Sequence, residues 1–255
     1  MAIKYTDNSN NAATSLADLI SKSIAPSSDW TAMSGADHFV QFYESDSHLV
    51  NSVAEWLTHG LKNGETCIIA ATHWHIDAIE RAARAFGANI DSAWNNGLYI
   101  PFGAQETLAK FMVNGMPDEE LFREAVGNTV RAAAKRGRVR AFGEMVTVLV
   151  AEGKPEAALK LEELWNDLRG QLSFSLFCAY PIAGVATSGR DNFMTDVCLG
   201  HTRVIPTESY TSLTTADERL RAVAFLQQRG RQLEAEIADL ERRISSRQDL
   251  AADYA

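Results

Sequence analysis

The chain has 255 residues, of which 46% are hydrophobic and 22% are charged, and its formal net charge at pH 7 is −9. Such a chain can bury a full core, and its negative charge argues against a protein that binds nucleic-acid phosphates through a basic face. No apolar run approaches the roughly 20 residues of a membrane span, and the N-terminus lacks the apolar core of a secretory signal. We therefore expect a cytoplasmic protein that contacts neither nucleic acid nor membrane.

The cysteine content fits a reducing compartment. Cys67, Cys178 and Cys198 are odd in number and far apart in the chain, and two of them lie in apolar runs. Disulfide frameworks instead use paired cysteines in oxidising compartments. The three residues are therefore predicted to be reduced, packed thiols.

In chain order, residues 1–36 are rich in Ser, Asn, Ala and Asp and are expected to form a mobile N-terminal segment. From His38 onward, short apolar runs alternate with helical periods. The predicted strands are HFVQFY (38–43), TCIIAA (66–71), GLYIPF (97–102), RVRAFGEM (138–145) and LSFSLFCAYPI (172–182). Strands that alternate with long helices predict a three-layer α/β fold with a mainly parallel sheet.

The C-terminal tail has a heptad pattern. Two sets of residues recur every seven positions, offset by three: first Val223, Gly230, Ile237 and Ile244, then Leu226, Leu233 and Leu240. Mostly β-branched residues in the first set and leucine in the second favour a parallel dimer. The tail therefore predicts a coiled-coil extension that forms a homodimer through residues 220–244. The alternative is one amphipathic helix that folds back on the domain.

Nucleotide-binding and hydrolase motifs are missing from the sequence. The first strand runs into the capping residues Ser45, Asp46 and Ser47 without any glycine. No GxxxxGKS/T motif occurs, no GxGxxG motif follows a strand, and there is no GxSxG motif. A standard phosphate loop is therefore excluded, and no catalytic residue is predicted.

The sequence HWH places His73 and His75 just after the strand at 66–71, where α/β sheets have their ligand crevice. Two histidines could begin a metal site, but a third ligand would have to come from elsewhere. Residues that cap the helix and line the crevice are the favoured interpretation, so no metal site is predicted.

Three further polar residues end predicted strands. Glu144 ends the fourth strand, where an acid commonly serves a metal ion or acts as a general base; it could equally be a first-turn carboxylate that favours the helix dipole. Cys178 and Tyr180 close the fifth strand and are expected to point towards the same edge. A buried thiol there is more often a packing residue than a nucleophile, because no base is adjacent.

These segments together resemble the MEDS family, a sensory domain named from regulators in methanogens and methylotrophs. The resemblance runs from about His38 to Pro206 and is carried by HFVQFYESDSHLV, GLKNGE, RAFGEMV, EGKPEAALKLEELWNDL, FCAYP and CLGHTRVIPTESY. It implies a sensory domain at 37–206, followed by a C-terminal amphipathic or coiled-coil helix at 207–255.

The resemblance also implies a RecA/KaiC-like α/β domain that has lost its phosphate loop and senses small organic compounds. The first strand then lies where the phosphate loop would be, and the strand at 138–145 lies where the magnesium-binding acid would be. The candidate ligand-binding residues are His38, Tyr43, Glu44, His73, Glu144, Trp165, Cys178 and Tyr180. Trp165 could instead be a core residue, since it shares the apolar face of its helix with leucines.

The sequence therefore predicts a non-enzymatic signalling sensor or regulatory module. It would bind a small ligand in the degenerate nucleotide crevice and act through a dimerising helix on a partner, such as a histidine kinase or another regulator. In a RecA-like order the first, fourth and fifth strands are neighbours, so His38, Tyr43, Glu144 and Tyr180 are expected to line one pocket. The alternatives are a divergent nucleotide-binding or hydrolytic enzyme that uses Glu144, and a structural adaptor without a ligand. The sequence names no cofactor.

Overall fold

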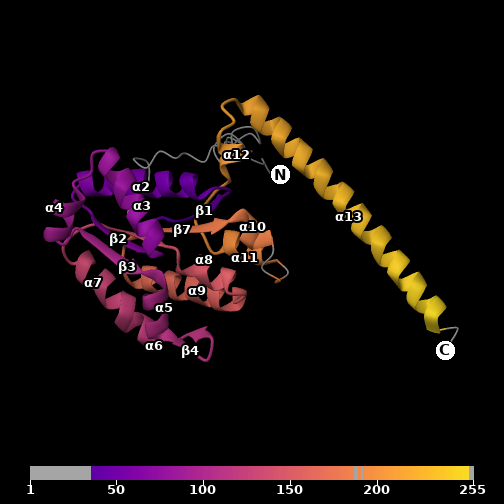
Figure 1. The fold of residues 1–255 in the computed structure, drawn as a ribbon, viewed down its shortest axis with the longest axis horizontal. Helices are drawn as coiled ribbons and strands as arrows, with labels where there is room; N and C mark the ends of the chain where they lie inside the picture. The colour runs from indigo at the N-terminus through magenta and orange to yellow at the C-terminus, as the bar shows by residue number, and fades with distance from the viewer. Residues whose placement is uncertain (1–35, 187–188, 191, 253–255) are drawn as a thin grey trace, which may run out of the picture. The chain divides into compact units, whose positions relative to one another are not determined.

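A computed structural model describes residues 36–186, 189–190 and 192–252. Most of the predicted N-terminal segment, residues 1–35, lies outside these ranges. Six strands form one parallel sheet in the order β3-β2-β6-β7-β1-β8 (Figure 1). They are β1 (His38–Tyr43), β2 (Thr66–Ala71), β3 (Tyr99–Gly103), β6 (Val139–Gly143), β7 (Ser175–Pro181) and β8 (Arg203–Ile205). The predicted α/β fold with a parallel sheet is confirmed, and β6, β7 and β1 are neighbours as expected for the first, fourth and fifth predicted strands.

Helices cover both faces of this sheet (Figure 1). One face carries α2 (Asp46–Lys62), α3 (His73–Ala85) and α4 (Ile90–Asn95). The other carries α5 (Ala104–Phe111), α6 (Glu119–Phe122), the π-helix η2 (Arg123–Gly127), α7 (Asn128–Ala134), α8 (Met145–Ala151) and α9 (Pro155–Gln171). The chain forms two compact units, and the sheet belongs to the one that ends at Thr211. Its remaining elements are the hairpin β4 (Met112–Val113) and β5 (Met116–Pro117), and the short helices α10 (Ile182–Ala186), α11 (Phe193–Leu199) and α12 (Glu208–Thr211).

Strand β1 shows why the sheet is buried on both faces. Val40 and Phe42 belong to the core under α9, whereas Phe39 and Tyr43 belong to the core under α2. Successive side chains of a strand point to opposite faces, so a strand with apolar residues at both sets of positions needs a helical layer on each side. Even-numbered residues of β1 therefore face the layer that contains α9, and odd-numbered residues face the layer that contains α2.

Helix α9 supplies the side chains that cover the centre of one face. Pro155 occupies its first turn, where the missing N–H costs nothing, as the sequence indicates. Leu161, Leu164, Trp165 and Leu168 are buried along this helix. Glu162 and Asn166 lie one turn apart on the same helix, with 4% of the surface of Glu162 exposed. The buried side of α9 is therefore apolar except for a short polar stripe.

The second unit contains helix α13 (Ala216–Ala252), which has 37 residues. Its large apolar side chains are exposed, from 42% at Leu233 to 67% at Phe225. Five of the predicted heptad positions, Leu226, Leu233, Ile237, Leu240 and Ile244, are among them. The predicted C-terminal helix is thus present and carries an uncovered apolar stripe. Among the residues described, no helix has both the length and the apolar character that crossing a membrane requires.

Candidate functional site

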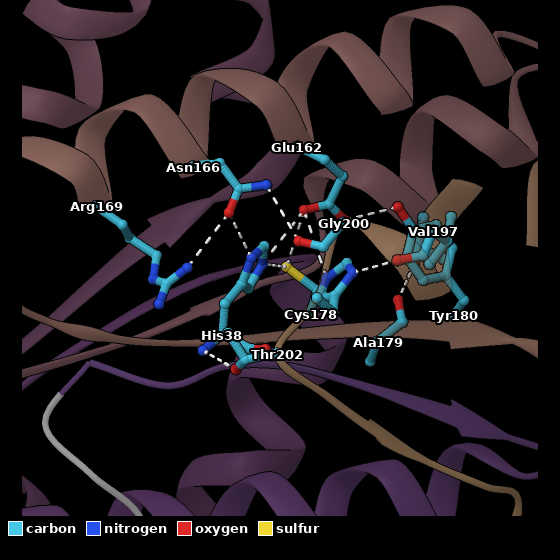
Figure 2. A network of polar contacts seen from close by, with 12 residues as sticks. His38, Glu162, Asn166, Arg169, Cys178, Ala179, Tyr180, Val197, Gly200 and Thr202 are labelled. Atoms are coloured by element: carbon cyan, nitrogen blue, oxygen red, sulfur yellow. Dashed lines mark hydrogen bonds and ion pairs between the residues drawn. The ribbon is translucent and has the colours of Figure 1, made fainter. Parts of the chain in front are cut away.

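A group of polar side chains is buried between the sheet and α9. It consists of His38, Glu162 and Cys178, which are labelled in Figure 2, and of His201; we call these four residues the buried cluster. His38 begins β1, Cys178 lies in the adjacent strand β7, Glu162 points down from α9, and His201 follows α11. One potential ligand atom from each of these residues lies within 4.8 Å of the other three. The fold therefore brings together residues that are up to 163 positions apart.

The distances within the cluster are short. His38 Nε2 lies 3.4 Å from Cys178 Sγ and 3.5 Å from Glu162 Oε2. Cys178 Sγ lies 3.4 Å from Glu162 Oε2, and His201 Nε2 lies 3.7 Å from the same oxygen. The rings of the two histidines are 4.0 Å apart between centroids. Glu162 Oε2 is thus the atom around which the group is arranged.

In both histidines of the cluster, Nδ1 faces a hydrogen-bond acceptor outside the cluster. His201 Nδ1 donates to the carbonyl oxygen of Val197 at 2.6 Å. His38 Nδ1 lies 2.9 Å from Asn166 Oδ1. The amide of Asn166 is oriented by its own contacts, because Asn166 Nδ2 donates to the carbonyl of Gly200 and Arg169 Nη1 donates to Oδ1. Both rings therefore carry a proton on Nδ1 and present Nε2 to the cluster.

The segment after α11 is fastened to β1 beside the cluster. The backbone N–H and the hydroxyl of Thr202 both donate to the carbonyl oxygen of His38 at 2.7 Å, and the N–H of His38 donates to the same hydroxyl at 2.9 Å. Since Thr202 directly follows His201, these bonds bring the second imidazole against the first.

Burial and charge together shift the acidity of the cluster. Burial alone would raise the pKa of Glu162, but His201, His38 and the hydroxyl of Tyr180 hold it below its ordinary value. Burial raises the pKa of the Cys178 thiol and of the Tyr180 phenol, and the Glu162 charge adds to both shifts. Burial also lowers the pKa of His201. The site thus favours a buried Glu162 carboxylate next to a neutral His201 imidazole.

A cavity of about 580 Å³ opens above the buried cluster. Its lining includes Glu162 of the cluster and Asn166, the hydrogen-bond partner of His38. The walls combine apolar residues from three elements with charged residues of both signs. The apolar residues are Met116, Leu159 and Leu199, and the charged ones include Lys160, Arg190 and Asp196.

The family assignment follows from the comparison with known proteins. Residues 37–202 match the family model described as "MEDS: MEthanogen/methylotroph, DcmR Sensory domain". The chain belongs to the MEDS family. The matched residues include every member of the buried cluster and all of β1, β2, β3, β6 and β7. No curated protein matches the chain.

The MEDS domain carries a second polar group at the carboxyl edge of its sheet. Glu144 follows β6 and accepts hydrogen bonds from the N–H of Thr72, at 2.8 Å, and from His75 Nδ1, at 2.5 Å. His75 Nε2 lies 3.9 Å from a carboxylate oxygen of Asp46. Burial raises the pKa of Tyr43, and the charges of Glu144 and Asp46 raise it further, so these groups lie close together. We call this the edge group.

The expectation that His38, Tyr43, Glu144 and Tyr180 line one pocket is wrong. His38 and Tyr180 lie on the α9 side of the sheet, where the Tyr180 hydroxyl donates to Glu162 Oε1 at 2.8 Å. Tyr43 lies on the α2 side and Glu144 at the carboxyl edge. The physical reason is the two-residue period of β1, because positions 38 and 43 differ by an odd number and must face opposite layers.

The other predicted site residues of the MEDS domain are separate from both groups. Trp165 is 1% exposed and packs edge-on against Phe122, which is the alternative core interpretation. His73 is largely exposed and lies 2.8 Å from a carboxylate oxygen of Glu106. Glu44 is exposed and accepts a hydrogen bond from the hydroxyl of Ser209 at 2.5 Å. None of the three contacts the buried cluster through a bond that the structure describes.

Three residues of the buried cluster and its support were not predicted. Glu162 and Asn166 form the polar stripe on α9, one turn apart next to a row of leucines, and this spacing is the signal that could have identified them. His201 lies in a polar segment without a periodic pattern, so its position depends on the strand pairing alone. Cys178, by contrast, was predicted as a site residue and lies inside the cluster.

Proposed function

We propose that this MEDS domain is the ligand-binding part of a signalling sensor, that its ligand binds in the cavity above the buried cluster, and that α13 transmits the signal through a homodimer to a partner such as a histidine kinase. The supporting observation is that the cavity is lined by Glu162, a member of the buried cluster, and by Asn166, which is hydrogen-bonded to His38 of the cluster. A molecule in this cavity would touch side chains that reach the sheet. Membership of a sensory family supports the same role.

The lining favours a small ligand that is partly polar. Apolar contacts are available from Leu159 and Met116, and the nearby cations are already paired, since Arg190 lies 3.0 Å from Asp196 and Lys160 lies 3.0 Å from Glu163. A ligand that carries a large net charge would have to break these pairs. Small organic acids, alcohols and amines fit this lining better than a nucleoside triphosphate does.

The alternative of a nucleotide-binding enzyme is disfavoured by the start of α2. A RecA/KaiC-like relationship, supported by the central order β6-β7-β1, would place a bound phosphate at this junction. There the carboxylate of Glu208 accepts hydrogen bonds from the N–H groups of Glu44 and Ser45, both at 2.8 Å, and from the Ser45 hydroxyl at 2.7 Å. An internal anion thus uses the donors that a phosphate would need. We expect no binding of Mg-ATP at millimolar concentration by calorimetry.

The cavity can be tested by filling it. A panel of small carboxylic acids, alcohols and amines would be screened by thermal shift on the full chain, on Leu159→Trp and on Phe86→Trp. Leu159 lines the cavity, whereas Phe86 is 39% exposed at the end of α3 and serves as the matched control. We expect at least one compound to raise the Tm of the wild type and of Phe86→Trp but not of Leu159→Trp. Compounds that shift all three proteins equally, or none of them, would favour the structural adaptor.

The dimer is a separate part of the proposal. The exposed apolar stripe of α13, including Leu226, Leu233 and Leu240, supports a parallel coiled coil. Truncation after Thr215 and the substitution Leu233→Asp, which would bury a charge in the seam, should each give a smaller species in light scattering. Arg231→Asp, at a position outside the two heptad sets, is the control and should leave the mass unchanged. An unchanged mass for both test proteins would exclude this interface.

A further inference from the structure

The buried cluster contains more hydrogen-bond acceptors than its protons can satisfy. His38 and His201 both use their Nδ1 protons outside the cluster, so both Nε2 atoms present lone pairs to the carboxylate of Glu162. His201 Nε2 has no hydrogen-bond partner among the described residues, although its side chain is completely buried. The thiol of Cys178 can donate one proton to only one of these atoms. Buried acceptors without donors lower the stability of the fold, so a bound cation would stabilise this arrangement.

The spacing of the four atoms fits a metal ion. Donor atoms bound to one tetrahedral zinc ion through nitrogen, oxygen and sulfur lie roughly 3.3–3.6 Å from one another. Three of the separations, 3.4 Å, 3.4 Å and 3.5 Å, lie in that range, the distance from His201 Nε2 to Glu162 Oε2 is 3.7 Å, and all four atoms lie within 4.8 Å of one another. Metal ions that accept a mixture of thiolate, imidazole and carboxylate belong to the zinc class of divalent transition metals.

The outer contacts also follow the pattern of a metal site. Histidines that bind metals through Nε2 normally donate the other ring proton to a carbonyl or carboxylate oxygen, which fixes the ring. Val197 and Asn166 supply these acceptors here. Glu162 is fixed in the same way, because Tyr180 donates to Oε1 and leaves Oε2 to face the other three donors.

We propose that His38, Glu162, Cys178 and His201 bind one divalent metal ion of the zinc class, a site that the sequence did not predict. Binding displaces the thiol proton of Cys178 to solvent and involves no change of oxidation state. The prediction of no metal site was drawn from the HWH segment, whose two histidines lie at the edge group and on the surface. The metal-binding histidines are instead His38, the first residue of β1, and His201, which follows α11.

A hydrogen-bonded cluster without metal is the competing interpretation. In that arrangement one imidazole carries a second proton and the thiol donates to Glu162 or to His38. The two interpretations differ in what the thiol does: a metal converts it to a bound thiolate, whereas a proton-bonded cluster leaves it neutral. Cobalt(II) reports this difference, because a cobalt–thiolate bond gives a charge-transfer band in the near ultraviolet, and tetrahedral cobalt gives strong visible bands.

The test is a cobalt(II) titration of the full chain after chelator treatment, with three proteins compared. Wild type should develop both sets of bands and saturate near one equivalent of cobalt per chain, and added zinc should bleach them. Cys178→Ser should lose the charge-transfer band. Cys67→Ser, in which an equally buried thiol on the other side of the sheet is replaced, should keep it. These results depend on the metal alone, so they are independent of whether the cavity binds a ligand.

Three outcomes would overturn the proposal. The first is the absence of a cobalt band in wild type at stoichiometric metal. The second is retention of the charge-transfer band in Cys178→Ser, and the third is its loss in Cys67→Ser. If Cys178→Ser does not fold, His201→Gln replaces it and should lower the affinity for cobalt at least tenfold, while His48→Gln, outside the cluster, should not.

Discussion

The MEDS domain buries two carboxylates to the same extent, Glu65 and Glu162, each with 4% of its surface exposed, but it surrounds them differently. Glu65 forms a short ion pair with the guanidinium of Arg140, which also lies over the ring of Trp56 at 5.4 Å. The remaining donors of Arg140 reach the carbonyl of Trp56 and His59 Nδ1. All three guanidinium nitrogens of Arg140 thus meet an acceptor, and its charge is balanced by that of Glu65.

Among the residues that the structure describes, no lysine or arginine forms an ion pair with Glu162. Its neighbours are a phenol, a thiol and two imidazoles whose protons point away, and it adjoins a cavity of about 580 Å³. A buried pair that is complete in itself is a structural feature, because it has nothing left to bind. A buried anion such as Glu162, which lies among other acceptors beside a cavity, can instead bind a cation. The contrast between Glu65 and Glu162 therefore separates a structural network from a candidate binding site.

The largest effect is expected for Glu65→Gln. This substitution leaves the buried guanidinium of Arg140 without its anion, and breaking one side of a buried pair costs about 3–5 kcal/mol. Urea denaturation at neutral pH measures this loss as a decrease in the free energy of unfolding. In the double variant Glu65→Leu/Arg140→Met most of the loss should be recovered, because both charges are gone. A loss below about 1 kcal/mol for the single variant would show that the pair is not structural.

Zinc should stabilise the wild type by an intermediate amount. Because the proposed site exists only in the folded state, free zinc at about 100 times its Kd should add about 2.7 kcal/mol to the free energy of unfolding. Glu65→Gln should show the same zinc-dependent increment, since Glu65 is not a ligand. Glu162→Gln should show little of it, because an amide oxygen is a much weaker ligand than a carboxylate. Equal increments in all three proteins would place the zinc elsewhere.

The same substitution at Glu162 should cost little when no metal is present. Glutamine keeps an oxygen that accepts from Tyr180 and gains an N–H₂ group that can donate to the free Nε2 atom of His201. We expect a change of about 1 kcal/mol or less in the free energy of unfolding of the chelator-treated protein. Urea denaturation of chelator-treated Glu162→Gln, measured in parallel with Glu65→Gln, checks this change. A loss as large as that of Glu65→Gln would mean that Glu162 already has its partners.

The smallest effect is expected for the partly exposed carboxylate of Glu208. Burial opposes its charge, but hydrogen bonds from Ser45 and Glu44 hold its pKa below the ordinary value of 4.5. A lowered pKa stabilises the fold above the unfolded-state value and is lost as the pH falls through the folded-state value. After solvent screening we expect about 0.5 kcal/mol at neutral pH. The stability difference between wild type and Glu208→Gln should therefore disappear between about pH 5 and about pH 3.

The sequence predicted the fold better than the site. Apolar runs and helical periods were sufficient for the parallel sheet, since strands buried on both faces have continuous apolar sequences. His38, Cys178 and Tyr180 were also predicted as site residues, because polar residues in such strands are conspicuous, and the structure places them in or against the buried cluster. What the sequence could not provide was the register that sets His38 opposite Leu176 and brings Cys178 beneath α9.

Two errors have different causes. The prediction that His38 and Tyr43 line a single pocket was avoidable. Their odd separation in the sequence already places them on opposite faces of one strand. The omission of His201 was not avoidable in the same way. Its ring reaches the cluster only because Thr202 pairs with the backbone of His38, 164 positions earlier in the chain. Long-range pairing of this kind leaves no local pattern in the sequence.

The metal content of the full chain, purified without chelators and measured by native mass spectrometry, is the decisive quantity. We predict one divalent ion of the zinc class per chain in wild type and in Glu65→Gln, and a content at least tenfold lower in Glu162→Gln. If wild type carries no metal and takes up none after one equivalent of zinc is added, the buried cluster is a hydrogen-bonded structural network like that of Glu65. The contrast between the two carboxylates would then be wrong.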